Sequence, residues 1–203
     1  MIAAADVLAR LVEGNERFVR GEARNAKFCK ETLAHLASGQ TPHATILGCS
    51  DSRVAPEVIF DAALGELFVI RVAGNVISPE VMGSMQYAAA HLGTPLFVVL
   101  GHEGCGAVHA ALESIHEGVQ HRSRIAKLIE SIVPGVAGIS AHLAPDEQLQ
   151  RAVEANVRWS MQQVMAIPEA KVRATEGTAM LVGAVYELAT GRVRILDSSE
   201  RGA

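Results

Sequence analysis

Two short apolar runs, each followed directly by a polar loop, constrain the fold of this chain most strongly. Residues 44–47 (ATIL) precede the loop 49–53 (CSDSR), and residues 96–100 (LFVVL) precede the loop 101–106 (GHEGCG). Continuous apolar runs of this length are typical of strands that are buried on both faces of a parallel sheet. Ligand and metal sites in such sheets collect at the carboxyl ends of the strands, near the point where the strand order reverses. We therefore expect both loops to meet at one edge of a sheet.

The rest of the chain alternates between strand and helix patterns and predicts an α/β fold, with a mainly parallel central β-sheet flanked by helices. With 203 residues the chain suits a single domain, in which residues 1–40 form an N-terminal helical arm and residues 41–203 the α/β core. Pro134-Gly135 is expected to break the helical pattern. We expect helices at about residues 6–21, 27–38, 56–61, 79–91, 107–116, 124–133 and 146–165, and strands at 43–48, 67–72, 96–101, 179–188 and 192–196.

Composition excludes several classes of function. The formal net charge is −4 without a run of like charges, and aromatic residues make up 4%, so neither a basic stripe nor a set of stacking side chains for nucleic acid is present. The first twenty residues contain acids and bases, unlike a signal peptide, and no apolar run is long enough to span a membrane. We expect a cytoplasmic protein, and three cysteines suit metal binding or catalysis there better than disulfides.

The N-terminal segment predicts an amphipathic helix, but the sequence does not show which surface this helix packs on. Asp6 is a possible helix cap, and an apolar stripe follows at helical spacing. That stripe consists of Val7, Leu8, Leu11, Val12 and Phe18. The helix and its successor at 27–38 could pack on their own chain or on a partner subunit.

The two loops together carry the donor set of a catalytic zinc site. Cys49, His102 and Cys105 supply two thiolates and an imidazole, and such a set leaves one coordination position open. His102 and Cys105 are three residues apart, the spacing of one helical turn, so both can face one point. Cys105 also precedes a predicted helix, whose free N–H groups favour a thiolate. A structural zinc site is the less favoured alternative, because such sites are usually closed by four Cys or His ligands.

Asp51 and Arg53 are expected to pair beside this metal. In an extended stretch alternate side chains point the same way, and a guanidinium favours the charged form of a carboxylate. An ionised Asp51 could orient a zinc-bound hydroxide, or it could bind the zinc and close the site. Zinc lowers the pKa of bound water from about 15.7 to about 7, which provides a nucleophile at neutral pH.

Two other features carry weaker functional interpretations. The glycines of residues 101–106 follow a strand but lack the spacing of a dinucleotide-binding loop and the acidic residue about 20 positions further on. Cys29, on the second predicted helix, is interpreted as a packing residue.

Four segments resemble the β-class carbonic anhydrases: CSDSRVAPEVIF (49–60), GELFVIRVAGN (65–75), SMQYAAAHLG (84–93) and VVLGHEGCGAV (98–108). The closing LVGAVYELATGRVRIL (181–196) is also similar to that family. The resemblance implies reversible hydration of carbon dioxide to bicarbonate and a proton by zinc-bound hydroxide, with one zinc per subunit and a homodimer or homotetramer. Glu103 departs from the family pattern, next to a ligand position.

The resemblance also implies roles for individual residues. Cys49, His102 and Cys105 correspond to the zinc ligands, and Asp51 with Arg53 to the carboxylate–arginine pair, Asp51 becoming a fourth ligand in a closed state. Three further residues correspond to residues of the substrate pocket: Gln40, Phe68 and Tyr87. In many members of the family the residue that corresponds to Gln40 reaches the pocket from a neighbouring subunit.

Two alternatives use the same metal site differently. The first is hydrolysis of carbonyl sulfide or carbon disulfide, whose electrophilic carbon is equivalent to that of carbon dioxide. The second is a zinc or redox sensor whose thiolates respond to oxidation, but it would leave Asp51 and Arg53 without a purpose.

Overall fold

The computed structural model describes residues 2–24, 33–34 and 36–198. A five-stranded sheet forms its centre, with the strand order β2-β1-β3-β4-β5. The first four strands are parallel and β5 runs antiparallel to β4. The strands are β1 (Ala44–Gly48), β2 (Leu67–Arg71), β3 (Leu96–His102), β4 (Met180–Tyr186) and β5 (Val193–Ser198). The predicted α/β class and mainly parallel sheet are confirmed.

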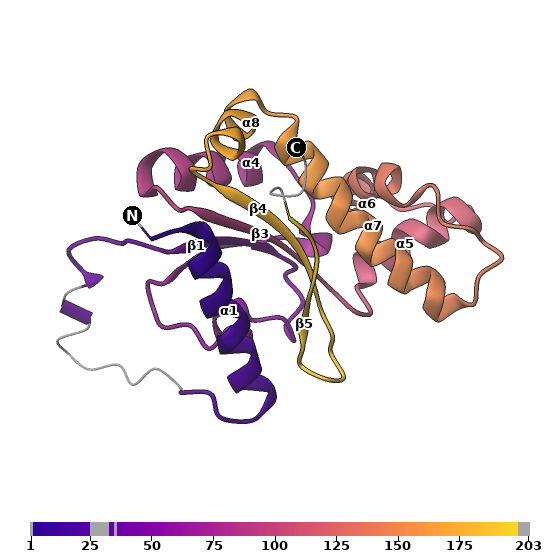
Figure 1. Cartoon of the computed structure of the whole chain (residues 1–203). Helices are drawn as coiled ribbons and strands as arrows, with labels where there is room; N and C mark the ends of the chain where they lie inside the picture. Colours follow the sequence, from indigo (N-terminus) through magenta and orange to yellow (C-terminus); the bar gives the residue numbers. More distant parts are fainter. Residues whose placement is uncertain (1, 25–32, 35, 199–203) are drawn as a thin grey trace.

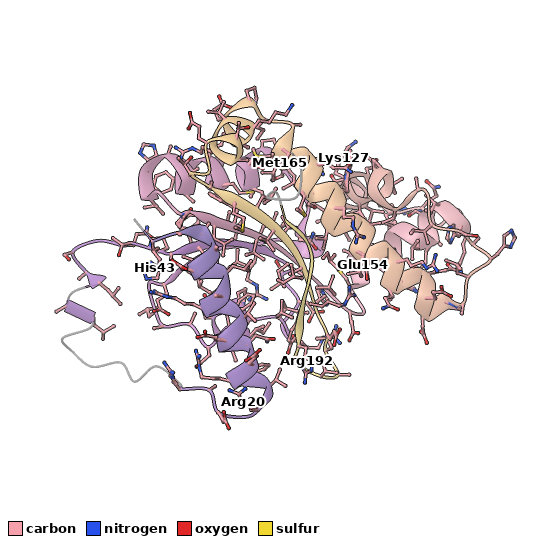
Figure 2. The ribbon with its side chains drawn as sticks, viewed as in Figure 1. Arg20, His43, Lys127, Glu154, Met165 and Arg192 are labelled. Atoms are coloured by element: carbon pink, nitrogen blue, oxygen red, sulfur yellow. The ribbon has the colours of Figure 1, made fainter. Side chains whose placement is uncertain are left out.

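Helices cover both faces of this sheet (Figure 1). On one face α1 and α3 pack on the side chains of β1, β3 and β4, and on the other α4 to α7 enclose a second buried cluster. The helices are α1 (Ala4–Val19), α3 (Pro56–Ile59), α4 (Pro79–Tyr87), α5 (Gly106–His116), α6 (Ser123–Val136), α7 (Pro145–Met165) and α8 (Pro168–Thr175), with a 3₁₀ turn η1 (Ala73–Asn75) and a π-helical turn η2 (Ala88–Leu92). Charged side chains such as Arg20 and Lys127 point outward (Figure 2).

The N-terminal helix packs on its own chain. Val7 and Leu11 are buried in the cluster that α1 shares with the sheet, whereas Val12 is 39% exposed. Asp6 lies in the first turn of α1 rather than at its cap, which is Ala3, so its carboxylate faces the positive end of the helix dipole without capping an N–H. The predicted helix at 27–38, with Cys29, lies mostly outside the described residues.

Two sequence-based expectations about helices are wrong. The expected break at Pro134-Gly135 comes later, because α6 continues to Val136 and contains Pro134 in its last turn, at the loss of one backbone hydrogen bond. Gly135 faces Trp159 so closely that a Cβ there would lie 2.6 Å from the Trp159 Cβ. The helix α8 was not expected, since its eight residues bury no side chain and so show no apolar stripe.

The register of the sheet brings the two polar loops together. Gly48 at the end of β1 is paired with Leu100 in β3, so Cys49 follows β1 beside the Gly101-His102 end of β3. The strand order reverses between β1 and β3, since β1 pairs with β2 on one side and β3 on the other. The loops therefore lie at the switch point of the sheet, as expected. Within the described ranges, no helix combines the length and apolar character that a membrane crossing requires.

Candidate metal centre

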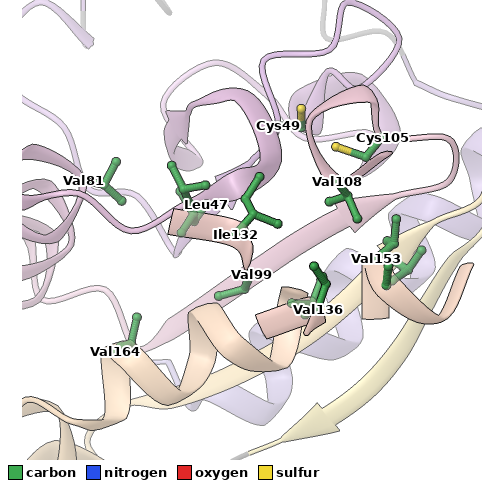
Figure 3. Close-up of a cluster of buried hydrophobic side chains, with 14 of the residues drawn as sticks. Leu47, Cys49, Val81, Val99, Cys105, Val108, Ile132, Val136, Val153 and Val164 are labelled. Carbon is green, nitrogen blue, oxygen red and sulfur yellow. The ribbon is translucent and has the colours of Figure 1, made fainter. Parts of the chain in front are cut away.

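Cys49, His102 and Cys105 converge on one point at the carboxyl edge of the sheet. The two sulfur atoms and a ring nitrogen of His102 all lie within 4.8 Å of one another, and all three residues are buried. In Figure 3 Cys49 and Cys105 lie close together on separate loops. Each residue comes from a different local structure: Cys49 follows β1, His102 ends β3, and Cys105 caps α5.

The approach of His102 and Cys105 depends on a tight turn and not on a helical one. His102 is still in β3, and Glu103 and Gly104 form the turn that returns the chain to Cys105. Gly104 has φ +63°, a left-handed conformation that a side chain would strain. The expectation that the two ligands share one helical turn is therefore wrong, although their side chains do meet.

The imidazole of His102 is oriented by a backbone hydrogen bond. Its Nδ1 donates to the carbonyl of Glu103 at 2.8 Å, which leaves Nε2 as the free nitrogen. Nε2 is buried and has no hydrogen-bond partner among the described residues. A buried polar atom without a partner costs free energy, which coordination to a metal would recover. Two thiols and this nitrogen are the donors that zinc prefers, so the residues fit a zinc ion.

The two thiols share one proton. Hydrogen bonds from Cys105 and from the Gly74 and Asp51 backbone lower the pKa of Cys49 to about 4, against the opposing effect of burial. The pKa of Cys105 is raised, because its thiol donates to the Cys49 sulfur and because it is buried. The N–H groups at the start of α5 oppose this rise without reversing it. The pair therefore carries one thiolate at neutral pH, which accepts a hydrogen bond from the other thiol.

Asp51 and Arg53 form the expected pair at the rim of this centre. Arg53 donates through Nε to Asp51 Oδ1 at 2.9 Å and through a terminal nitrogen to Oδ2 at 2.7 Å, and its backbone N–H adds a third bond at 3.0 Å. These bonds hold the pKa of Asp51 well below its usual range, so the carboxylate is ionised. Asp51 Oδ2 lies 3.9 Å from His102 Nε2.

The loop that carries Cys49 and Asp51 is fixed by a residue that the sequence did not single out. Arg71, at the end of β2, donates to the carbonyl oxygen of Cys49 at 3.0 Å and to that of Asp51 at 2.7 Å. Glu103 has a similar structural contact, since its carboxylate accepts the backbone N–H of Leu188 at 2.9 Å. It thereby connects the ligand turn to the hairpin between β4 and β5.

The three residues expected in the substrate pocket lie away from the metal ligands of this chain. Phe68 pairs with Thr45, four residues before Cys49, which at about 3.3 Å per residue places it about 13 Å further down the sheet. Tyr87 lies beside it, with 6.2 Å between the ring centroids, and is 47% exposed. Gln40 is also exposed.

Comparison with known proteins agrees with the geometry of this centre. Residues 44–193 match the family model described as carbonic anhydrase. Carbonic anhydrase 2 of Mycobacterium tuberculosis is 43% identical over 92% of this chain and 90% of its own length, and the carbonic anhydrase of Mycolicibacterium smegmatis is 39% identical over 91% and 89%. The solved structure of a Coccomyxa β-carbonic anhydrase in complex with acetazolamide is 29% identical, covers 94% of this chain and 87% of that one, and superimposes with a TM-score of 0.73. The chain therefore belongs to the β-class carbonic anhydrases.

Proposed function

We propose that this carbonic anhydrase holds one zinc ion per subunit on Cys49, His102 and Cys105 and uses it to hydrate carbon dioxide reversibly to bicarbonate and a proton. The observation that carries the proposal is the convergence of two sulfurs and an unpartnered, buried ring nitrogen within 4.8 Å. Zinc bound there would supply a Lewis acid that makes water a nucleophile near neutral pH.

Asp51 and Arg53 control the direction of attack. The ionised carboxylate of Asp51 is an acceptor only, so its Oδ2 accepts a hydrogen bond from the attacking water and aims a lone pair at the carbon of carbon dioxide. The bidentate grip of Arg53 keeps Asp51 from swinging freely toward the metal. This grip supports an orienting role for Asp51 in preference to a role as fourth ligand.

The substrate pocket is completed by a second copy of the chain. Phe68 and Tyr87 lie together near the amino end of β2, whereas Cys49 lies at the carboxyl edge of the sheet. They therefore cannot line the metal centre of their own subunit. Phe68, Tyr87 and Gln40 remain accessible to a partner, so Phe68 and Tyr87 would fill their predicted pocket role from a neighbouring subunit, as was predicted for Gln40, in a homodimer or homotetramer. The free thiols of Cys49 and Cys105 support a reducing compartment such as the cytoplasm.

Stopped-flow measurement of carbon dioxide hydration by the zinc-loaded protein at pH 8.5 tests the proposal. We expect turnover well above the buffer rate, with bicarbonate dehydration detected in the reverse direction. A rate equal to buffer, with one zinc bound per chain, would overturn it. In the same preparation, hydrogen sulfide release from carbon disulfide without carbon dioxide hydration would identify the hydrolase alternative.

A further inference from the structure

Two polar side chains in the buried face of α7 have no part in the chemistry described above. Asn156 is 1% exposed and Ser160 is fully buried, and both lie one helical turn apart among apolar neighbours. Burying such groups is unfavourable unless they make hydrogen bonds, so their contacts indicate what they do.

Both side chains bind the same short turn, η1, which follows β2. The Asn156 amide donates through Nδ2 to the carbonyl of Gly74 at 2.8 Å, and the Ser160 hydroxyl donates to the carbonyl of Asn75 at 3.0 Å. The other amide atom of Asn156, Oδ1, has no partner among the described residues. The donated hydrogen bond to Gly74 is therefore the polar contact that the structure provides for this buried amide.

The turn that they hold has an unusual backbone. Gly74 and Asn75 both have positive φ values, +67° and +44°, and the second is uncommon for a residue with a side chain. Such a conformation persists where surrounding contacts determine it. The two α7 side chains anchor the carbonyls of these same two residues, which accounts for its persistence.

Gly74 connects this turn to the metal centre. The backbone N–H of Gly74 donates to the sulfur of Cys49 at 3.3 Å, in a buried contact. Asn156 thus binds the carbonyl group of Gly74, and the N–H group of Gly74 binds the Cys49 sulfur. Cys49 and Cys105 share a buried cluster with Val153, which lies one turn before Asn156 on α7 (Figure 3).

We propose that Asn156 is a positioning residue for the metal: it fixes the Gly74 turn so that its N–H holds the Cys49 sulfur in place, and Ser160 assists it. Groups that orient metal ligands typically contribute 10–100-fold to metal affinity. The proposal rests on the assignment of Cys49, His102 and Cys105 as the zinc ligands.

The test measures the zinc dissociation constant of the intact protein by competition with a chelator, for wild type and for Asn156→Ala. Val164→Ala is the matched control, because Val164 is also a buried α7 residue and lies two helical turns beyond Asn156, where it faces a pocket with Met82 and Phe97. We expect Asn156→Ala to weaken zinc binding about 10–100-fold, and Val164→Ala to leave it within about 2-fold while it lowers stability. Equal zinc affinity in wild type and Asn156→Ala would overturn the proposal.

A spectroscopic measurement separates positioning from general destabilisation. In the cobalt-substituted protein, loss of an N–H bond to a ligand sulfur should move the sulfur-to-metal charge-transfer band to lower energy in Asn156→Ala and leave it unchanged in Val164→Ala. Should Asn156→Ala fail to fold, Ser160→Ala removes the milder anchor and should shift both measurements in the same direction; no shift there contradicts the proposal. Failure of wild type itself to bind zinc would instead refute the ligand assignment.

Discussion

Replacement of Gly74 by alanine should destabilise the protein far more than replacement of another left-handed glycine. An alanine at φ +67° adopts a left-handed conformation that costs about 1–2 kcal/mol. Its Cβ would also lie 2.7 Å from Cδ1 of Ile132 and 3.1 Å from the Cβ of Ala107, and Ile132 is fully buried. Such overpacking costs typically about 1–3 kcal/mol more.

Gly93 provides the matched control for the backbone contribution. It has φ +65°, and a Cβ there would meet nothing within 4 Å, so Gly93→Ala carries only the left-handed strain. Urea unfolding of both variants at one fixed zinc concentration should give Gly74→Ala a loss of free energy of unfolding larger by about 1–3 kcal/mol. Losses that agree within about 0.5 kcal/mol would refute the packing argument.

The remaining predictions concern the ligands, the orienting carboxylate and a buried ion pair. Cys49→Ser should lose zinc and carbon dioxide hydration together, as measured by metal analysis and stopped flow, and full zinc content would disprove its role as a ligand. Asp51→Ala should keep about one zinc per chain yet lose turnover by roughly 10²-fold or more, since only the orientation of the nucleophile is removed; a sharp loss of zinc would make Asp51 a ligand. Asp61 is 4% exposed in its side chain and pairs with Arg17 at 2.6 Å, and although burial opposes it, the hydrogen bonds from Arg17 and the Arg24 backbone lower the pKa of Asp61. Because the pKa of Asp61 is lower in the folded than in the unfolded chain, its carboxylate stabilises the folded protein above the unfolded pKa of about 3.9. Asp61→Asn should therefore lower the free energy of unfolding by about 1–3 kcal/mol at pH 7, and by progressively less as pH falls below 4. Denaturation curves measure this difference, and a difference independent of pH would contradict the prediction.

The ligand loops could be predicted from the sequence because their positions depend on local patterns. An apolar run followed by Cys49 or by His102 predicts a strand and the polar loop at its carboxyl end, and parallel strands place such ends on one edge. The pairing of Asp51 with Arg53 is likewise local, since the two residues are separated by one position.

The supporting contacts could not be predicted in the same way, because they join segments far apart in the chain. Arg71 reaches the Cys49 loop only through the pairing of β2 with β1, and Asn156 reaches Gly74 across 82 positions. A signal was present in α7, where Asn156 and Ser160 occupy the inward stripe at a spacing of four. Polar residues in such a stripe indicate buried hydrogen bonds, although the partner cannot be read from the spacing.

The pocket residues depend on information that a single chain does not carry. Phe68 and Tyr87 do lie side by side, but a full strand length separates them from the ligands of their own subunit. Their predicted role therefore depends on the arrangement of a second copy. The extension of α6 past Pro134-Gly135 depends on tertiary packing, such as the contact of Gly135 with Trp159, which outweighs the local preference of these two residues to end a helix.

Zinc-edge X-ray absorption on the purified protein at pH 8.5 tests the central claim most directly. Two sulfur atoms at about 2.3 Å and nitrogen or oxygen atoms at about 2.0–2.1 Å completing a four-coordinate shell are expected if Cys49, Cys105 and His102 hold the ion with one position open to water. A shell with fewer than two sulfurs, or a protein that neither contains nor takes up zinc, would contradict the account.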